Sequence, residues 1–276
     1  MKHLLFLTLK VLVLIAALCL AYGFLVEPRL LKVRQVKVTA TISKPIKIAL
    51  ISDLHIGGLH VPAERIIQTA AKINAQNPDI IFLAGDYVNG HKRREDHAQA
   101  FNDKLDRGLA ALSNLSAPLG VYAAMGNHDE WYSQSYLVEA LTQAGVTVLV
   151  NQAVNIANVC IVGLADADTD IEDPMAFEAC PTDSNILALM HSPDSFQYLR
   201  PDTVIAVAGH THGGQINLPF LGRAITATQL GKPYAYGVRD WQGIPVVITA
   251  GLGTSILPAR FRSAPEIVII ELAPAL

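Results

Sequence analysis

Cysteine is scarce in this sequence, which contains three among 276 residues. Cys19 lies in an apolar N-terminal run, and Cys160 and Cys180 lie in the body of the chain. An isolated pair at that separation indicates neither a disulfide framework nor a CxxC metal site. We therefore expect two small buried thiols, and a domain of about 240 residues that is stabilised by its apolar core alone.

Basic residues are not in surplus either. The chain has 21 Lys and Arg against 24 Asp and Glu, a formal net charge of −3. No basic stripe with interleaved aromatic residues is present, which excludes a nucleic acid as the expected partner. Internal repeats, low-complexity segments and linkers are also missing. The length therefore predicts one α/β domain with a short N-terminal extension.

One long apolar run is present, at the N-terminus. Leu4–Val26 is apolar apart from two polar residues, and it is long enough to cross a bilayer if Lys10 reaches toward a headgroup. We expect an uncleaved transmembrane anchor over residues 1–27. Small residues at Ala21 and Gly23 leave a removed signal peptide as an alternative, and a buried amphipathic helix is a third.

Basic residues near this run suggest its orientation. The amino terminus and two lysines precede or begin the run, and five basic residues follow it: Arg29, Lys32, Arg34, Lys37 and Lys44. The positive-inside rule then places the main domain on the cytoplasmic face. Alternation over Val33–Ile42 predicts a half-exposed strand. We divide the chain into the anchor, a juxtamembrane segment with a first strand at 28–45, and a main domain at 46–276.

Beyond residue 45, apolar runs alternate with helical patterns. The runs are Ile46–Ile51, Ile80–Ala84, Val121–Met125, Ile186–Met190 and Val204–Ala208, and the helical patterns cover Pro62–Gln76, Glu95–Leu115 and Ser133–Ala144. Continuous apolar runs of this length are typical of strands that are buried on both faces. The alternation predicts an α/β core with helices packed outside it. Three later strand patterns without helices between them, Tyr234–Arg239, Val246–Thr249 and Ile267–Leu272, predict that the sheet becomes mixed.

Polar residues follow each of the five apolar runs, at the strand ends where open α/β sheets place their ligand sites. In chain order they are Asp53 and His55, then Asp86, then Asn127, His128 and Asp129, then His191, and finally His210 and His212. Carboxylate and amide oxygens together with imidazole nitrogens suit Mn, Fe, Zn or Ni.

The spacing within these groups supports a metal site. Residues two apart on an extended chain share a face, so the pairs Asp53-x-His55 and His210-x-His212 can each point to one side. Three glycines precede ligand positions and allow the chain to turn close to an ion. They are Gly85, Gly126 and Gly209. Each motif alone also fits an ordinary turn, cap or hydrogen-bonded histidine; their joint occurrence indicates a metal centre.

These motifs resemble the five signature blocks of the calcineurin-like metallophosphoesterases. The matching blocks are Asp53-Leu-His55, Gly85-Asp86, Gly126-Asn127-His128-Asp129, His191 and Gly209-His210-Thr-His212. The anchor, the pair Glu27-Pro28 and the segment from Gly251 to Glu266 resemble the membrane-associated branch of YkuE- and YaeI-like proteins. The resemblance implies a four-layer αββα sandwich of mixed sheets.

The resemblance also implies a role for each site residue. A first divalent metal would be bound by Asp53, His55, Asp86 and His212, and a second by Asp86, Asn127, His191 and His210, with Asp86 bridging. His128 would stabilise the phosphorus or protonate the leaving oxygen, with Asp129 orienting its ring. Such a pair of metal ions supports hydrolysis of phosphodiester or pyrophosphate bonds.

The expected substrate is lipid-linked. Leu218, Phe220 and Leu221 follow the last metal motif, and they can either admit an acyl chain or pack beneath their own loop. Some relatives in this branch hydrolyse UDP-2,3-diacylglucosamine in the lipid A pathway, which would place the enzyme at the bacterial inner membrane. The alternatives are a tethered enzyme of soluble nucleotides and a non-catalytic binding module. Arg223, Arg260 and Arg262 are either phosphate contacts or surface charges.

Overall fold

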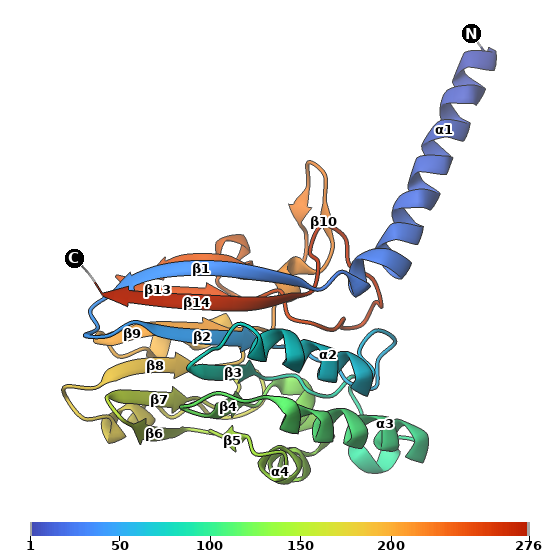
Figure 1. Ribbon diagram of the computed structural model, residues 1–276. Helices are drawn as coiled ribbons and strands as arrows, with labels where there is room; N and C mark the ends of the chain where they lie inside the picture. The colour runs from blue at the N-terminus through green and yellow to red at the C-terminus, as the bar shows by residue number, and fades with distance from the viewer. Residues whose placement is uncertain (1, 275–276) are drawn as a thin grey trace.

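Two six-stranded sheets form the body of the protein in a computed structural model that describes residues 2–274 (Figure 1). The first sheet has the order β1 (Lys32–Ala40), β14 (Glu266–Pro274), β2 (Ile46–Ile51), β3 (Ile80–Ala84), β4 (Val121–Ala124) and β5 (Thr147–Val148). The second has the order β12 (Gly237–Trp241), β13 (Ile244–Ile248), β9 (Thr203–Ala208), β8 (Asn185–Leu189), β7 (Val159–Gly163) and β6 (Gln152–Ile156). A short hairpin joins β10 (Asn217–Leu218) to β11 (Gly222–Arg223).

Both sheets are mixed, as predicted. Strands β2 to β5 are parallel to one another, and β14 is antiparallel to β2. In the second sheet β7, β8, β9 and β13 are parallel, and the two edge strands β6 and β12 are antiparallel to their neighbours. Strand β1, inside the predicted juxtamembrane segment, pairs with β14 over its whole length and so belongs to the first sheet.

Helices cover the first sheet on its outer face. They are α2 (Ala63–Asn74), α3 (Gln99–Ala110) with the 3₁₀ turn η4 (Ala111–Asn114), and α4 (Asn127–Gln143). The second sheet is covered by the short 3₁₀ helices η5 (Pro174–Ala179) and η6 (Pro193–Tyr198). The remaining short turns are η3 (Arg94–Asp96), η7 (His212–Gly214) and η8 (Lys232–Ala235). The layers thus follow the order helix, sheet, sheet, helix.

The apolar core explains why the strands have continuous apolar sequences. On β2, Ile48 and Leu50 belong to the cluster between the two sheets, whereas Ala49 and Ile51 belong to the cluster beneath the helices. Side chains of a strand alternate between faces, so a strand in the middle of a four-layer sandwich buries both sets. Burial on both faces fixes the register of β2 and hence the position of the residues that follow it.

Several predicted boundaries were wrong. Helix α4 begins at Asn127 and not at Ser133; the backbone of Ser133 is extended (φ 175°, ψ 97°), so the helical turns before it form a separate segment. Tyr234 lies in η8, and the strand that was predicted over Tyr234–Arg239 starts at Gly237. Strands β5, β6 and β7 were not predicted from the sequence.

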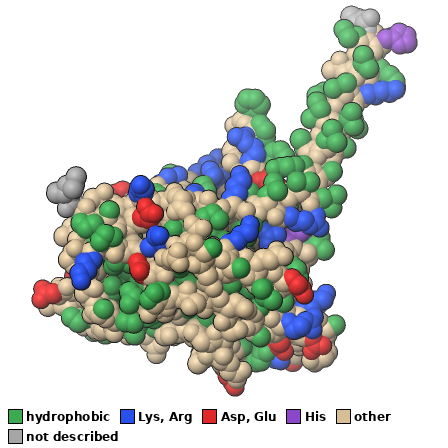
Figure 2. All heavy atoms as spheres, in the orientation of Figure 1, with side chains coloured by type: hydrophobic (Ala, Val, Ile, Leu, Met, Phe, Trp, Pro, Cys, Tyr) green, Lys and Arg blue, Asp and Glu red, His purple; other side chains and the backbone are tan. Residues whose placement is uncertain are grey.

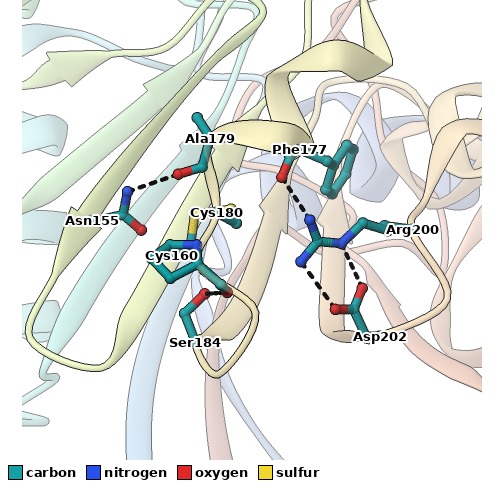
Figure 3. Close-up of a disulfide and its surroundings, with 9 residues drawn as sticks. Asn155, Cys160, Phe177, Ala179, Cys180, Ser184, Arg200 and Asp202 are labelled. Atoms are coloured by element: carbon teal, nitrogen blue, oxygen red, sulfur yellow. Dashed lines mark hydrogen bonds and ion pairs between the residues drawn. A yellow bond between two sulfur atoms is a disulfide. The ribbon is translucent and has the colours of Figure 1, made fainter.

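The prediction of free thiols at Cys160 and Cys180 was also wrong, since the two residues form a disulfide (Figure 3). Cys160 lies on β7, and η5 returns the chain across the sheet edge so that the two Cα atoms are 5.6 Å apart. Asn155 Nδ2 donates a hydrogen bond of 3.0 Å to the carbonyl of Ala179, which fixes the end of η5 beside the sheet. This proximity depends on the tertiary path of the chain, and the spacing of the two residues could not show it.

The N-terminal helix α1 (Lys2–Ala21) projects from the body, as Figure 1 shows. None of its residues is buried, which argues against the alternative of a buried amphipathic helix. Among the described residues it is the one helix long and apolar enough to cross a membrane. The chain continues through η1 (Tyr22–Val26) and η2 (Glu27–Arg29) into β1. Helix α1 is therefore a candidate membrane anchor.

Candidate metal centre

The carboxyl ends of five strands bring the predicted ligands together. Strands β2, β3 and β4 are parallel in the first sheet, and β8 and β9 are parallel in the second. The predicted ligands follow them: Asp53 and His55 after β2, Asp86 after β3, Asn127 after β4, His191 after β8, and His210 and His212 after β9. Their carboxylates and imidazoles form two groups, and the ligand atoms of each group lie within 4.8 Å of one another.

The first group consists of Asp53, His55, Asp86 and His212, all of them buried. His55 Nε2 lies 3.1 Å from His212 Nε2 and 3.6 Å from Asp86 Oδ2. Asp53 Oδ1 lies 3.4 Å from His212 Nε2 and, although buried, accepts no hydrogen bond from any residue between 2 and 274. Two imidazole nitrogens and two carboxylates thus face one place.

The second group consists of Asp86, His191 and His210. His191 Nε2 lies 3.4 Å from Asp86 Oδ2 and 3.1 Å from His210 Nδ1. Asn127 adds an amide oxygen, since its Oδ1 lies 3.3 Å from His191 Nε2. Because Asp86 belongs to both groups, its carboxylate lies between two adjacent sites.

The backbone at the ligands is strained. Five of them have positive φ angles: Asp53 (52°), His55 (46°), Asp86 (59°), His210 (67°) and His212 (51°). Only a few per cent of residues other than glycine adopt this region, and each instance costs on the order of 1–3 kcal/mol. Cross-strand hydrogen bonds hold them, such as Asp53 N to Gly85 O at 2.9 Å and His55 N to Asp86 O at 3.1 Å. Strain concentrated at one place indicates a functional site.

The three predicted glycines are needed for close packing of the ligands. A Cβ added to Gly85 would lie 2.6 Å from His191 Nδ1, and one on Gly126 would lie 2.4 Å from Asp86 Oδ1. At Gly209 it would lie 1.9 Å from the hydroxyl of Ser52. A side chain at any of these positions would therefore displace a ligand or its support.

The donor atoms fit divalent cations. The Nδ1 atoms of His55 and His191 face the carbonyls of Val88 and Ala84, so Nδ1 carries the proton and Nε2 is left to bind a metal. Burial lowers the pKa of His55 to about 3, which keeps its imidazole neutral. Burial also raises the pKa of Asp53 to about 7, and a neighbouring cation would favour its ionised form. The centre can hold two metal ions.

His128 lies beside this centre without belonging to either group. Its Nδ1 is 2.6 Å from the carbonyl of Gly90, and its Nε2 is 3.9 Å from Asp86 Oδ2 and 3.4 Å from the hydroxyl of Ser255. The Gly90 carbonyl fixes the proton on Nδ1. The outer nitrogen, Nε2, is thereby directed toward the metal groups.

The resemblance implied that Asp129 orients the His128 ring, but its carboxylate binds the backbone of a neighbouring loop. Its carboxylate accepts hydrogen bonds from the backbone of Asp86 (2.8 Å), Tyr87 (2.8 Å) and Gly126 (2.9 Å). The contact that orients the His128 ring comes from Gly90 instead. Asp129 therefore shapes the loop that carries Asp86, as an acceptor for amides that no strand satisfies.

Three neighbours of the site were missed from the sequence. The ring of His91 lies 4.6 Å from that of His128, Ser255 contacts His128, and Asp168 Oδ2 lies 3.3 Å from His210 Nε2. No motif marks them, because all three come from loops.

The sequence left two roles open for Arg260, a surface charge or a phosphate contact. The structure supports neither role, since Arg260 is fully buried and donates to backbone carbonyls such as that of Ala250.

Two adjacent cation sites at the strand ends of a two-sheet sandwich define a dinuclear metallohydrolase. Residues 46–214 match the profile of the calcineurin-like phosphoesterase family. The phosphodiesterase YaeI of Escherichia coli (strain K12) is 32% identical over 243 residues, covering 83% of this chain and 82% of YaeI. The uncharacterized metallophosphoesterase YkuE of Bacillus subtilis (strain 168) is 30% identical over 236 residues, covering 82% and 78%. A Danio rerio transmembrane protein with a metallophosphoesterase domain is 27% identical over 252 residues, covering 83% and 54%.

The chain belongs to the calcineurin-like phosphoesterase family. It has the calcineurin-like α/β fold of mixed sheets and is a metal-dependent phosphoesterase. These findings confirm the predicted family, fold class and reaction class, together with the prediction of a centre for two divalent metals.

Proposed function

We propose that the protein hydrolyses a phosphodiester or pyrophosphate bond in a lipid-linked substrate, and that α1 anchors it in the membrane that holds this lipid. The observation that carries the proposal is the hairpin β10–β11, which follows His212 closely in the chain. At its tip Phe220 is 108% exposed and Leu221 is 68% exposed. These side chains do not pack beneath their own loop, and they are free to contact acyl chains.

The base of the hairpin is tied to the foot of α1. Asn217 N donates to the carbonyl of Phe261 at 2.8 Å, and Phe261 N donates to the carbonyl of Gln215 at 2.9 Å. The neighbouring Arg260 N donates to the carbonyl of Gly23, at the end of the anchor, at 2.9 Å. Figure 1 shows the hairpin rising from the side of the body that α1 leaves. Apolar side chains lie at the tip, with Lys and Arg side chains beneath them (Figure 2).

We propose that α1 crosses the bilayer and that the hairpin lies at the membrane surface. An interfacial apolar tip with basic residues below it suits a surface of lipid headgroups. His212 lies in η7, which precedes the hairpin in the chain, and we propose that a lipid held by the tip reaches the metal centre along this segment. We propose that residues 1–27 are the anchor, that 28–45 join it to the sandwich, and that 46–276 form the catalytic domain.

We assign the site residues as follows. The first metal ion would be held by Asp53, His55, Asp86 and His212, and the second by Asp86, Asn127, His191 and His210. When bound, the two ions provide an activated water and neutralise charge on the phosphoryl group. His128 acts from its imidazolium form: it gives the Nε2 proton to the leaving oxygen and is left neutral, with its remaining proton on Nδ1 hydrogen-bonded to the carbonyl of Gly90. Asp129 supports the catalytic site by fixing the Asp86 loop.

The membrane face of the domain affects the choice of substrate. The count of basic residues favours the cytoplasmic face, but several of these residues belong to β1 and the positive-inside rule is weak for large domains. The disulfide between Cys160 and Cys180 favours an oxidising compartment. We propose that the domain lies on the outer face of the bacterial inner membrane. To test this, free thiols are alkylated in intact membranes and the peptides that contain Cys160 and Cys180 are analysed. Free thiols at both residues would contradict an outer face.

A direct assay tests the lipid proposal. The full chain, loaded with Mn²⁺, is compared on UDP-2,3-diacylglucosamine, on the same compound without its acyl chains, and on bis-p-nitrophenyl phosphate. The proposal predicts at least a roughly tenfold slower reaction without acyl chains, since each buried CH₂ contributes about 0.8 kcal/mol. Turnover of a phospholipid without a nucleotide is measured in parallel, so that a nucleotide-linked lipid substrate can be distinguished from other lipid phosphodiesters. Equal rates on acylated and deacylated substrates would favour the alternative, a tethered enzyme of soluble nucleotides.

Two variants test whether the hairpin contributes to lipid binding and not to the hydrolytic reaction itself. Phe220→Ser combined with Leu221→Ser is expected to slow hydrolysis of the lipid about tenfold, because two apolar contacts are lost, and to leave bis-p-nitrophenyl phosphate unaffected. Ile171→Ser is the matched control, since Ile171 is 83% exposed. Its carbonyl accepts a hydrogen bond from Asn151, which lies between β5 and β6, the edge strands of the two sheets. If the control slows lipid hydrolysis as much, the hairpin has no specific role.

A further inference from the structure

A second cavity lies at the foot of the anchor helix, among residues that the metal centre does not use. It has a volume of about 550 Å³. Its wall is formed by the end of the anchor, the loop before α2 and the first turns of α2, and it includes Arg29, Leu30, Leu59, His60, Arg65 and Lys72. Cavities of this size are typical of sites for small molecules or headgroups.

The charge of the cavity is unbalanced. Arg29, Arg65 and Lys72 line it, and Glu64 is the one acidic residue in its lining. Nε and Nη2 of Arg65 are buried and have no hydrogen-bond partner among residues 2–274. Burial and the charge of Arg29 both lower the pKa of Arg65. Buried guanidinium donors without an acceptor are unfavourable unless a ligand provides one.

Two further polar groups face the same cavity. His60 is 4% exposed, and its Nδ1 has no hydrogen-bond partner among the described residues, while Nε2 binds the carbonyl of Pro258 at 2.9 Å. The N-terminus of α2 also lies in the wall, and its N-cap residue Pro62 provides no side-chain cap. Uncapped helix N-termini present free N–H groups and a partial positive charge, both of which favour anions.

Apolar residues border the basic cavity on the side of the anchor. Leu59 is 67% exposed and Leu30 is 43% exposed, and both contribute to the wall. The exposed side chains of Leu25 and Val26 precede them in the chain. Figure 2 shows Lys, Arg and His side chains gathered at the foot of the projecting helix, below its apolar surface. The cavity thus combines an anion site with an apolar exit along the helix.

We propose that this cavity binds the phosphate group of an anionic phospholipid, whose acyl chains lie along α1. The arginines and the α2 N-terminus contact the phosphate oxygens, and Leu30 and Leu59 contact the start of the chains. The lipid fixes the foot of the anchor against the body, near the Pro258 carbonyl that His60 contacts. The proposal rests on the membrane location of α1 and does not depend on the substrate of the metal centre.

Binding is tested with the full chain in micelles of a neutral detergent. Thermal unfolding is followed while dioleoylphosphatidylglycerol, dioleoylphosphatidylcholine, glycerol 3-phosphate or inorganic phosphate is added. We expect phosphatidylglycerol to raise the melting temperature in a saturable manner and phosphatidylcholine to have no such effect. Arg65→Gln should weaken the apparent affinity for phosphatidylglycerol at least about fivefold, because one cationic contact is lost. Lys72→Gln, at an exposed position, tests the same site with little risk to folding.

Arg93→Gln is the matched control, because the Arg93 side chain is 77% exposed and does not line the cavity. Loss of affinity in Arg65→Gln and Lys72→Gln, with Arg93→Gln unchanged, supports the site. A response to phosphatidylglycerol at concentrations where glycerol 3-phosphate and phosphate have no effect identifies the lipid as the ligand. Equal responses to the soluble phosphates would overturn the lipid assignment. Equal loss in all three variants, or no response to any phosphate compound, would overturn the site itself.

Discussion

The two ligand groups of the metal centre are held in different ways. In the first group, all four residues are buried and follow strands or turns that the core fixes. In the second, the His210 side chain is 12% exposed, and its outer nitrogen faces Asp168, whose own side chain is 42% exposed. Asp168 lies in the loop between β7 and η5. We infer that the first site is rigid and closed, and that the second is open and exchanges its ion more readily.

Asp86 is the residue that the two groups share, so its loss should have the largest effect. Asp86→Ala is expected to empty both sites and to lower turnover by at least on the order of 10³-fold, because metal ions contribute several kcal/mol to transition-state stabilisation. Metal content by mass spectrometry and hydrolysis of bis-p-nitrophenyl phosphate measure this. Asp183→Ala, at an exposed acidic residue, is the control. An Asp86→Ala variant that keeps both ions would refute the bridging role.

A variant of His128 can distinguish loss of catalysis from loss of the metal ions. His128→Ala should keep both ions and lower turnover about 10²-fold or more, since a general acid of this kind contributes on the order of 10²–10⁴-fold. Ser255→Ala removes a neighbour of the same ring and should cost much less. Turnover and metal content are measured on the same samples. Metal loss that explains all of the lost activity would show that His128 supports the sites and does not transfer a proton.

Asp168 tests whether the second group depends on its exposed loop. Asp168→Asn should weaken binding of the second ion by about 10–100-fold, as loss of a partner to a ligating histidine does, and should leave the first ion unaffected. Calorimetric titration of the metal-free protein gives both affinities. Asp170→Asn, in the same loop and also exposed, is the matched control. Equal weakening of both ions would remove the distinction between a closed and an open site.

The disulfide should have the smallest effect on turnover. Cys160 and Cys180 enclose the loop that carries Asp168, with a sequence separation of 20. Replacing both with Ser should lower stability by about 3 kcal/mol, because the unfolded chain gains freedom, and should lower the melting temperature. Cys19→Ser, in the exposed helix α1, should leave stability unchanged. A double variant with unaltered melting temperature would show that the crosslink does not stabilise this loop.

Both ligand groups could be predicted from the sequence, because each ligand follows an apolar run. Asp53, His55 and Asp86 follow strands whose apolar residues are buried on both faces, so the strand ends could be located from composition alone. The ligands of the second group were predicted in the same way, because His191 and His210 follow two similar strands. What supports them was not predicted, since Asp168 lies in a loop with no periodic pattern.

Contacts between residues that are distant in the chain could not be predicted from the sequence either. The contact of Asp129 with the Asp86 loop joins residues 43 positions apart, and no local rule places a carboxylate under a distant amide. The start of α4 was missed because the helical turns that carry Asn127 and His128 are separated by the kink at Ser133 from the helix that was predicted. Arg260 seemed to be a surface charge because arginine is rarely fully buried.

The most direct test is a crystal structure of the Mn²⁺-loaded protein with anomalous scattering data. Two anomalous peaks that share Asp86 are expected, one bound by Asp53, His55 and His212 and the other by Asn127, His191 and His210. The second peak should have the lower occupancy when Mn²⁺ is limiting. A single peak, or ligand side chains that point away from a common cavity, would contradict the account.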